Sequence, residues 1–368
     1  MSRADVVVIG GGIIGCALAQ ELAQRGRRVI VLERGQIGAE ASSAAAGILS
    51  AQMDIEQPGP FFELCQAARR LYPAWVKQVE RDSGVHVDFH VDGILYVAMT
   101  ATEEQRMARR AQWQRRQGFQ VERWSPADVR RREPYVDGPV RRGFYFPTEA
   151  QIDNVALMRG LAIACRKAGV IIRERTAARR LVIRRQAVQG VQTNRGIVTA
   201  PVVVNCTGSW ISAGGSFPFS LPVRPARGQM LAFEGPKRLF RHAVMSERAY
   251  VVQRRDGRLL VGSTIEFAGF DKSLTLQGMH GILCGLRHMS RILNQCRFLE
   301  AWAGLRPYTD DRLPILGRTP VDGLYVATGH FRHGILLAPV TARLLTQLIL
   351  RGRTSSNLSP FSVSRFGR

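Results

Sequence analysis

The chain has 368 residues, 45% of them hydrophobic, which is enough apolar material for more than one core region. Its 52 lysines and arginines against 29 acidic residues give a net charge of +23, the kind of excess that nucleic-acid-binding proteins carry. However, 48 of the 52 cations are arginines scattered in short clusters, and no DNA- or RNA-binding motif accompanies them. We therefore interpret the charge as an arginine-rich surface and expect no nucleic-acid partner.

The chain carries no clear export or membrane signal. Its first 20 residues superficially resemble a signal peptide, but Asp5 and the glycine cluster inside the apolar run argue against that. Apolar runs such as "GILLAPV" are too short and too interrupted to span a bilayer. The six cysteines lie far apart, with no CxxC pair and no cluster with histidine, so neither a disulfide framework nor a metal site is expected. We expect a cytoplasmic protein with no membrane span.

Residues 5–34 predict a strand, a glycine turn, a helix and a second strand. Gly10, Gly12 and Gly15 form G-x-G-x-x-G directly after the apolar run "VVVI", and Glu33 closes the second strand 23 residues after Gly10. In such a unit the first glycine makes the tight turn, the second lets backbone approach a pyrophosphate, and the third lets helix and strand pack closely. The acid accepts hydrogen bonds from ribose hydroxyls. The stretch therefore predicts a dinucleotide site at a helix N-terminus.

The remaining chain alternates between strand and helix patterns. A short alternating segment, "GILYVAM", precedes a polar helical stretch, residues 102–117, and a helix is expected over 153–169. "APVVVNCTGSW" reads as another buried strand, and residues 222–265 as antiparallel strands. The end, residues 323–350, again reads as strand, glycine loop and helix, with Pro339 in the first helical turn.

Each end of the chain reads as a β-α-β-like unit, and strand-rich segments lie between the two ends. This order predicts an α/β fold, α+β overall. We expect a Rossmann-type nucleotide-binding domain with an inserted substrate domain built on a mixed or antiparallel sheet. The nucleotide-binding domain is discontinuous and takes residues 1–84, 146–222 and 303–368. The substrate domain takes residues 85–145 and 223–302.

The glycine loop alone does not distinguish NAD from FAD, but two further segments favour a flavin. Residues 40–52, "EASSAAAGILSAQ", are rich in small side chains that let backbone approach a ligand. Residues 327–339, "ATGHFRHGILLAP", form a second glycine loop feeding a helix. A carboxy-terminal segment of this kind often closes a flavin site.

A series of motifs along the chain resembles the FAD-dependent D-amino-acid oxidase family, and within it the glycine oxidases of thiamine-thiazole synthesis. The motifs are, in order, "VVIGGGIIG", "SSAAAGIL", "RLYPAW", "VVVNCTGSW", "AYVVQR", "AWAGLRP" and "GHFRHGILLAP". The resemblance covers essentially the whole chain. It implies an FAD-binding fold with noncovalent FAD, which agrees with the lack of cysteine in residues 297–332, where related sarcosine oxidases tether the flavin.

The resemblance assigns FAD contacts residue by residue. Near the amino terminus they are Gly10, Gly12, Ile13, Ile14, Gly15, Glu33, Arg34, Ser42, Ser43, Ala46, Gly47 and Ile48. Farther along the chain they are Ala178, Thr207, Gly208 and the carboxy-terminal stretch His330, Phe331, Arg332, His333, Gly334, Ile335 and Leu336. The helix that follows Gly334 would stabilise negative charge on a reduced flavin.

The same resemblance places the substrate. Arg306 and Tyr250 would bind the substrate carboxylate, and with Arg332, which lies beside the active site, they are the expected catalytic residues. Ile265 and Arg248 are further expected substrate-binding residues. A guanidinium suits this role because its planar fork matches a carboxylate. From the residues alone, Arg306 has an alternative: a structural ion pair with the nearby Asp310 or Asp311. Arg248, Ile265 and His333 depart from the residues that related glycine oxidases carry.

The implied reaction is oxidation of glycine, or of sarcosine or a small D-amino acid, to an imine, with dioxygen reduced to hydrogen peroxide. The imine hydrolyses to glyoxylate and ammonia or passes to thiazole synthesis. The resemblance also implies a homo-oligomer and transient contact with a thiazole synthase. Two alternatives stay open: an oxidase or dehydrogenase for another amine such as D-proline, and a noncatalytic FAD-binding subunit of a dehydrogenase complex.

Overall fold

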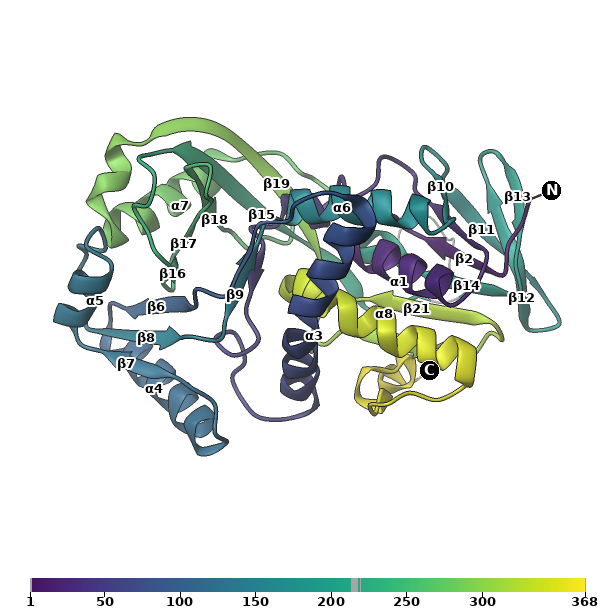
Figure 1. Ribbon diagram of the computed structural model, residues 1–368, viewed down its shortest axis with the longest axis horizontal. Coiled ribbons are helices and arrows are strands. Elements are labelled where there is room, and N and C mark those ends of the chain that lie inside the picture. Colours follow the sequence, from purple (N-terminus) through teal and green to yellow (C-terminus); the bar gives the residue numbers. More distant parts are fainter. Residues whose placement is uncertain (1, 213–217, 219, 368) are drawn as a thin grey trace.

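The computed structural model describes residues 2–212, 218 and 220–367. Two sheets lie at the two ends of an elongated molecule (Figure 1). The long antiparallel strands β15 (Val223–Glu234) and β19 (Arg297–Thr309) run through the middle and join them. Both chain termini lie at the end that holds the first βαβ unit.

One sheet has six strands in the order β10-β3-β2-β14-β21-β20. All pairs are parallel except β20 with β21. The runs "VVVI" and "VIVL" are buried along their whole length, as expected for strands covered on both faces. The strands are β2 (Val6–Ile9), β3 (Val29–Leu32), β10 (Ile171–Arg173), β14 (Val202–Asn205), β20 (Ile315–Arg318) and β21 (Leu324–Thr328).

Helices pack on one face of this sheet and a second, smaller sheet on the other. The helices are α1 (Ile13–Gln24), α3 (Pro60–Ser83), α6 (Asn154–Lys167) and α8 (Gly334–Arg351), which share one apolar core. The small sheet consists of β1 (Ser2–Arg3), β11 (Ala178–Arg184), β12 (Ala187–Thr193) and β13 (Gly196–Thr199). This arrangement is the Rossmann-type domain that the sequence predicts.

The other large sheet has eight strands in the order β19-β15-β18-β17-β16-β6-β8-β7 and is mixed, because β6 and β16 run parallel. Helix α4 (Ala101–Arg116) covers one face, and α5 (Pro126–Arg132) and α7 (Leu276–Met289) cover the other. The strands not yet given are β6 (Ile94–Ala98), β7 (Glu122–Trp124), β8 (Arg142–Phe146), β16 (Ala243–Met245), β17 (Tyr250–Gln253) and β18 (Arg258–Gly262). The expected mixed or antiparallel sheet is thus confirmed.

Three short strands and a short helix connect the two large sheets. The strands β4 (Ile48–Leu49), β9 (Ala150–Ile152) and β5 (Phe89–His90) form a three-stranded sheet, and α2 (Ala41–Ala44) precedes β4. Both α2 and β4 come from the stretch of small residues after the second strand. Five 3-10 turns complete the description: η1 (Gly208–Ser212), η2 (Arg291–Gln295), η3 (Phe331–His333), η4 (Ser359–Phe361) and η5 (Val363–Phe366).

The position of Pro339 in helix α8 differs from the sequence expectation. The helix begins at Gly334, so Pro339 lies inside it and not in its first turn. A proline there leaves the carbonyl of Ile335 without its helical donor, and the Tyr72 hydroxyl of α3 donates to that oxygen at 3.1 Å. The neighbouring helix therefore supplies the hydrogen bond that the proline removes.

Helix α8 also bears on whether a segment of this chain could span a membrane. Among the described residues one segment, Phe331–Arg351, is long and apolar enough to cross a membrane, which the sequence analysis did not expect. However, 67% of its apolar window is buried inside the protein, where α8 packs against α1 and α3. We interpret it as a core helix.

Candidate active site

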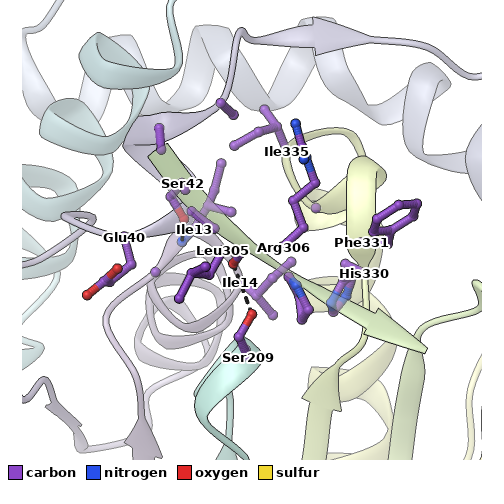
Figure 2. Close-up of a pocket in the computed structure, with 18 of the residues that line it drawn as sticks. Ile13, Ile14, Glu40, Ser42, Ser209, Leu305, Arg306, His330, Phe331 and Ile335 are labelled. Carbon is purple, nitrogen blue, oxygen red and sulfur yellow. Dashed lines mark hydrogen bonds between the residues drawn. The ribbon is translucent and has the colours of Figure 1, made fainter. Parts of the chain in front are cut away.

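A cavity of about 470 Å³ lies where the carboxyl ends of the parallel strands meet β15, β19 and the start of α8 (Figure 2). This volume falls within the range of small-molecule and cofactor sites. Residues from both large sheets line it, so one ligand can contact both ends of the molecule. The position, beyond the carboxyl ends of the strands, is where open α/β sheets bind ligands.

The three glycines of the loop after β2 have different surroundings. Gly10 adopts a φ of 103°, and a Cβ there would lie 2.6 Å from the carbonyl oxygen of Cys206. A Cβ on Gly15 would lie 2.0 Å from the carbonyl oxygen of Gly10. Gly15 is buried in α1 and does not line the cavity, as its packing role requires, whereas Gly10 and Gly12 do. The loop thus has the arrangement of a phosphate-approaching turn.

The amino end of α1 faces the cavity as a site of partial positive charge. The Ile13 N–H donates to Ser42 Oγ at 2.9 Å, and no acidic residue lies in the first helical turn. Glu33 is held at the cavity wall because its carboxylate accepts from the N–H groups of Gly11 (2.8 Å) and Gly35 (2.7 Å). This end of the cavity therefore combines the amino end of a helix with an acid.

The small residues of α2 and β4 form a backbone-rich wall that is supported from behind. Asn154 Nδ2 donates to the carbonyls of Ser42 (2.8 Å) and Ser43 (3.1 Å), and Trp302 Nε1 donates to that of Ala44 (3.0 Å). Gly47 has a φ of 70° and leaves no room for a Cβ. Of the predicted contacts here, Ser42, Ala46, Gly47 and Ile48 line the cavity and Ser43 does not.

The loop before α8 brings two buried histidines to the opposite wall. His330 Nε2 lies 3.2 Å from Thr341 Oγ1, and burial lowers the pKa of His330 to about 3. Burial likewise lowers the pKa of His333 to about 4, and both its ring nitrogens are buried without a partner among the described residues. Both rings are therefore neutral near pH 7, and the nitrogens of His333 require a partner from a ligand or water.

Arg306 is a cation without a counter-charge among the residues that the structure describes. Its guanidinium donates to the Thr264 carbonyl (3.1 Å) and the Ser263 hydroxyl (2.8 Å), and among the described residues no carboxylate lies within 4.0 Å of it. The two aspartates that sequence reasoning offered as partners are engaged elsewhere: Asp310 with Arg224, and Asp311 with Arg365. The guanidinium is thus available for an anionic ligand.

Tyr250 and Arg332 line the same part of the cavity. The Tyr250 hydroxyl lies 3.1 Å from Met230 Sδ. Arg332 differs from Arg306 because it is paired, at 3.0 Å, with Asp54. Burial lowers the pKa of Arg306, but an arginine so shifted remains a cation at neutral pH.

Two predicted substrate residues are not brought into the cavity. Arg248 is exposed in the turn between β16 and β17, and Ile265 is 50% exposed after β18; neither lines the cavity. The other predicted cofactor and substrate residues, apart from Gly15 and Ser43, do line it. Lining residues that sequence reasoning missed include Glu40, Asp54, Trp210, Gly228, Met230, Met245 and Ser263.

Gly228 explains how the guanidinium of Arg306 fits against β15. A Cβ at this position would lie between 2.1 and 2.4 Å from three guanidinium atoms. We therefore expect Gly228→Ala to displace Arg306 and to raise KM for a carboxylate substrate roughly tenfold or more while FAD stays bound. Gly281→Ala, where the added methyl group meets open space, is the matched control for steady-state kinetics. An unchanged KM in Gly228→Ala would contradict the assigned contact.

The fold and cavity define a class: an oxidoreductase whose dinucleotide cofactor lies across a Rossmann-type domain and a substrate-binding sheet. The glycine loop, the amino end of α1, Glu33 and the unpartnered His333 nitrogens together fit an extended cofactor with phosphates at one end and a polar ring system at the other. The chain belongs to the FAD-dependent oxidoreductase family, whose model matches residues 5–348. FAD is therefore its cofactor, and it is an enzyme.

Individual proteins that this chain resembles include glycine oxidases. The chain is 33% identical to a glycine oxidase of Geobacillus kaustophilus, covering 99% of this chain and 97% of that protein. A crystal structure of glycine oxidase from the same organism matches with a TM-score of 0.96, 32% identity and 99% coverage of both chains. The chain is also 36% identical to the bifunctional protein ThiO/ThiG of Trichormus variabilis, covering 98% of this chain and about half (55%) of that protein's length.

Proposed function

We propose that this protein is an FAD-dependent oxidase of glycine and of similar small amines such as sarcosine or small D-amino acids. The products are the imine, or glyoxylate and ammonia after hydrolysis, and hydrogen peroxide from dioxygen. The observation that carries the proposal is the guanidinium of Arg306, beside Tyr250, which pairs with no carboxylate of the described residues and lines the cavity that suits FAD. Full-length similarity to glycine oxidases supports the choice of substrate.

In the proposed site the protein binds and orients the substrate. FAD, when bound, would supply the redox chemistry, in which a hydride leaves the substrate and the electrons pass on to dioxygen. Arg306 holds the carboxylate with two parallel hydrogen bonds, and Tyr250 donates a third from its hydroxyl. Met230 and Met245 give the cavity an apolar wall that excludes water. His330 and His333 stay neutral and place no positive charge near the substrate amine.

We also propose how FAD is held. Gly10 and Gly12 at the amino end of α1 would hold the pyrophosphate, the Glu33 carboxylate would accept hydrogen bonds from the ribose hydroxyls, and residues 330–336 would hold the ring system. Binding is noncovalent. Cys206 lines the cavity, but burial raises the pKa of its thiol far above the usual range, so it carries no reactive thiolate.

The remaining proposals concern organisation and partners. The FAD domain takes residues 1–84, 146–222 and 303–368, and the substrate domain takes 85–145 and 223–302, with β19 crossing between them. A thiazole synthase is the proposed consumer of the imine, which the fused relatives named ThiO/ThiG support. We further propose a cytoplasmic homo-oligomer.

Peroxide production tests the function. Purified protein should be yellow, anaerobic glycine should bleach it, and air should restore the colour with release of peroxide. Glycine, sarcosine, D-alanine and both enantiomers of proline form the panel, because a structural neighbour with 25% identity is an L-proline dehydrogenase. Turnover of proline but not of glycine would overturn the substrate assignment. Flavin that no amine reduces would favour a noncatalytic subunit.

A further inference from the structure

A buried carboxyl group that the proposed mechanism does not use lies beneath the active-site wall. Glu149 follows the turn between β8 and β9, and its side chain is completely buried (0% exposed). One carboxylate oxygen accepts from the Ala51 N–H at 2.9 Å, and the other lies 3.5 Å from the Met53 N–H. The carboxylate therefore supports residues 50–54 through their backbone N–H groups.

The loop of residues 50–54 ends at Asp54, which is the counter-ion of the active-site residue Arg332. Ser50 and Asp54 line the cavity, the Asp54 N–H donates to Ser50 Oγ at 3.2 Å, and Asp54 binds Arg332 at 3.0 Å. Other contacts hold carbonyl groups of this loop: Gln66 donates to the Ala51 carbonyl and Arg110 to that of Met53. Those donors do not titrate near neutral pH, whereas a carboxyl group can.

We propose that Glu149 is a positioning residue of the active site, which braces residues 50–54 and, through Asp54, sets how firmly Arg332 is held away from a bound carboxylate. The inference deepens the proposed function and rests on it. When Glu149 is ionised, the loop is fixed and Asp54 neutralises Arg332. When Glu149 is protonated, its oxygens accept the loop N–H groups more weakly, Asp54 loosens, and Arg332 becomes available to the ligand.

The surroundings of Glu149 place its titration near neutral pH. Burial raises the pKa of Glu149 to about 7, and hydrogen bonds from Ser50, Ala51 and Met53 oppose the rise. The charged or titratable groups that face it, within the described residues, are Asp54 on the same loop and Arg69 and Cys65 on α3. Asp54 is a like charge and adds to the rise, whereas Arg69 favours the ionised form.

Binding of glycolate, measured by the perturbation of the flavin spectrum, tests the proposal without turnover. Glycolate resembles the substrate but stays ionised from about pH 5.5 to 8.5 and has no amine. In the wild type we expect its Kd to rise about fivefold over this range, with a midpoint near pH 7. In Glu149→Gln the Kd should stay at the tighter value throughout.

The chain offers a matched control and a second variant. Glu133 is also 0% exposed and accepts from backbone N–H groups, those of Arg241 and His242, but it does not line or support the cavity. Glu133→Gln should keep the wild-type pH profile. Asp54→Asn should lose it even though Glu149 is intact, because the coupling runs through Asp54. A profile that persists in Glu149→Gln or in Asp54→Asn would overturn the proposal, and Asp54→Asn alone decides it if Glu149→Gln does not fold.

The glycolate experiment also distinguishes failure of this proposal from failure of the proposed function. If neither the wild type nor any variant binds glycolate, the carboxylate site itself is wrong.

Thermal unfolding tests the role of Glu149 without any ligand. Because the pKa of Glu149 is raised, the folded protein holds the Glu149 proton more tightly than the unfolded chain does. The contribution of Glu149 to the stability of the fold is therefore full below about pH 4.5 and is lost as the pH rises through about 7. The Tm of the wild type minus that of Glu149→Gln should therefore fall with rising pH, and the Glu149→Gln and Asp54→Asn effects should be non-additive. A constant difference or simple additivity would overturn the brace.

Discussion

Arg306→Ala should lower kcat/KM for glycine by roughly a hundredfold to twenty-thousandfold while the protein keeps its FAD. Each charge-assisted hydrogen bond to a carboxylate contributes about 1.5–3 kcal/mol, and two such bonds are lost. Arg306 makes no ion pair with a carboxylate in the described part of the chain, so its removal breaks no salt bridge of the fold. Steady-state kinetics together with the flavin spectrum of the purified variant make the measurement.

Arg291→Ala is the control for this substitution. Arg291 is an exposed arginine whose Nε lies 2.8 Å from Asp137 and which does not line the cavity. It should leave kcat/KM unchanged within about twofold. If Arg306→Ala matched this control, the carboxylate clamp would be wrong. If it emerged colourless, Arg306 would belong to the cofactor site.

Gly12→Val should abolish FAD retention in a protein that still folds. Gly12 has a φ of −75°, which any residue can adopt, and the nearest atom to an added Cβ is Ser42 Oγ at 3.2 Å. A side chain therefore fits once the Ser42 side chain shifts by a few tenths of an ångström, but the valine methyl groups would occupy the space in front of the α1 amino end where the pyrophosphate would bind. The ratio of flavin to protein absorbance, with circular dichroism for folding, gives the result.

Gly281→Val serves as its control, because a Cβ at Gly281 on α7 meets no atom within 4 Å. This variant should be yellow and active, and it should lose no helix propensity, because glycine is a poorer helix former than valine. A Gly12→Val protein that retained stoichiometric FAD would refute the phosphate-loop assignment. Gly15 is less suitable for this test, since a Cβ there meets the Gly10 carbonyl and would disturb folding itself.

The sequence predicted best those features that depend on local geometry. A glycine that must adopt positive φ or lie against backbone, such as Gly10, is visible as a motif, and so is the buried run that precedes it. Arg306 was found for the same reason, because it lies within a recognisable segment of one strand. Its freedom from Asp310 and Asp311 was not predictable, since the partners of those aspartates, Arg224 and Arg365, are distant in sequence.

The features that sequence reasoning missed depend on long-range contacts. Helix α3 was not predicted, and Pro73 in its interior obscures the helical pattern. Pro339 was placed wrongly in the first turn of α8, because the hydroxyl that compensates it comes from Tyr72, more than 250 residues away. Asp54 and Glu149 look like ordinary acidic residues in the sequence, and only the fold brings both to the loop beside the cavity.

The β15–β19 ladder has a consequence for how molecules reach the flavin. Its pairing runs from Val223 opposite Thr309 to Glu234 opposite Arg297, and both strands contribute cavity residues, among them Gly228 and Arg306. Because the two strands run together through the middle of the molecule, swinging its two ends apart would bend this ladder and strain its backbone hydrogen bonds. We therefore expect substrate and product to pass through movements of side chains at the cavity rim, which favours small substrates.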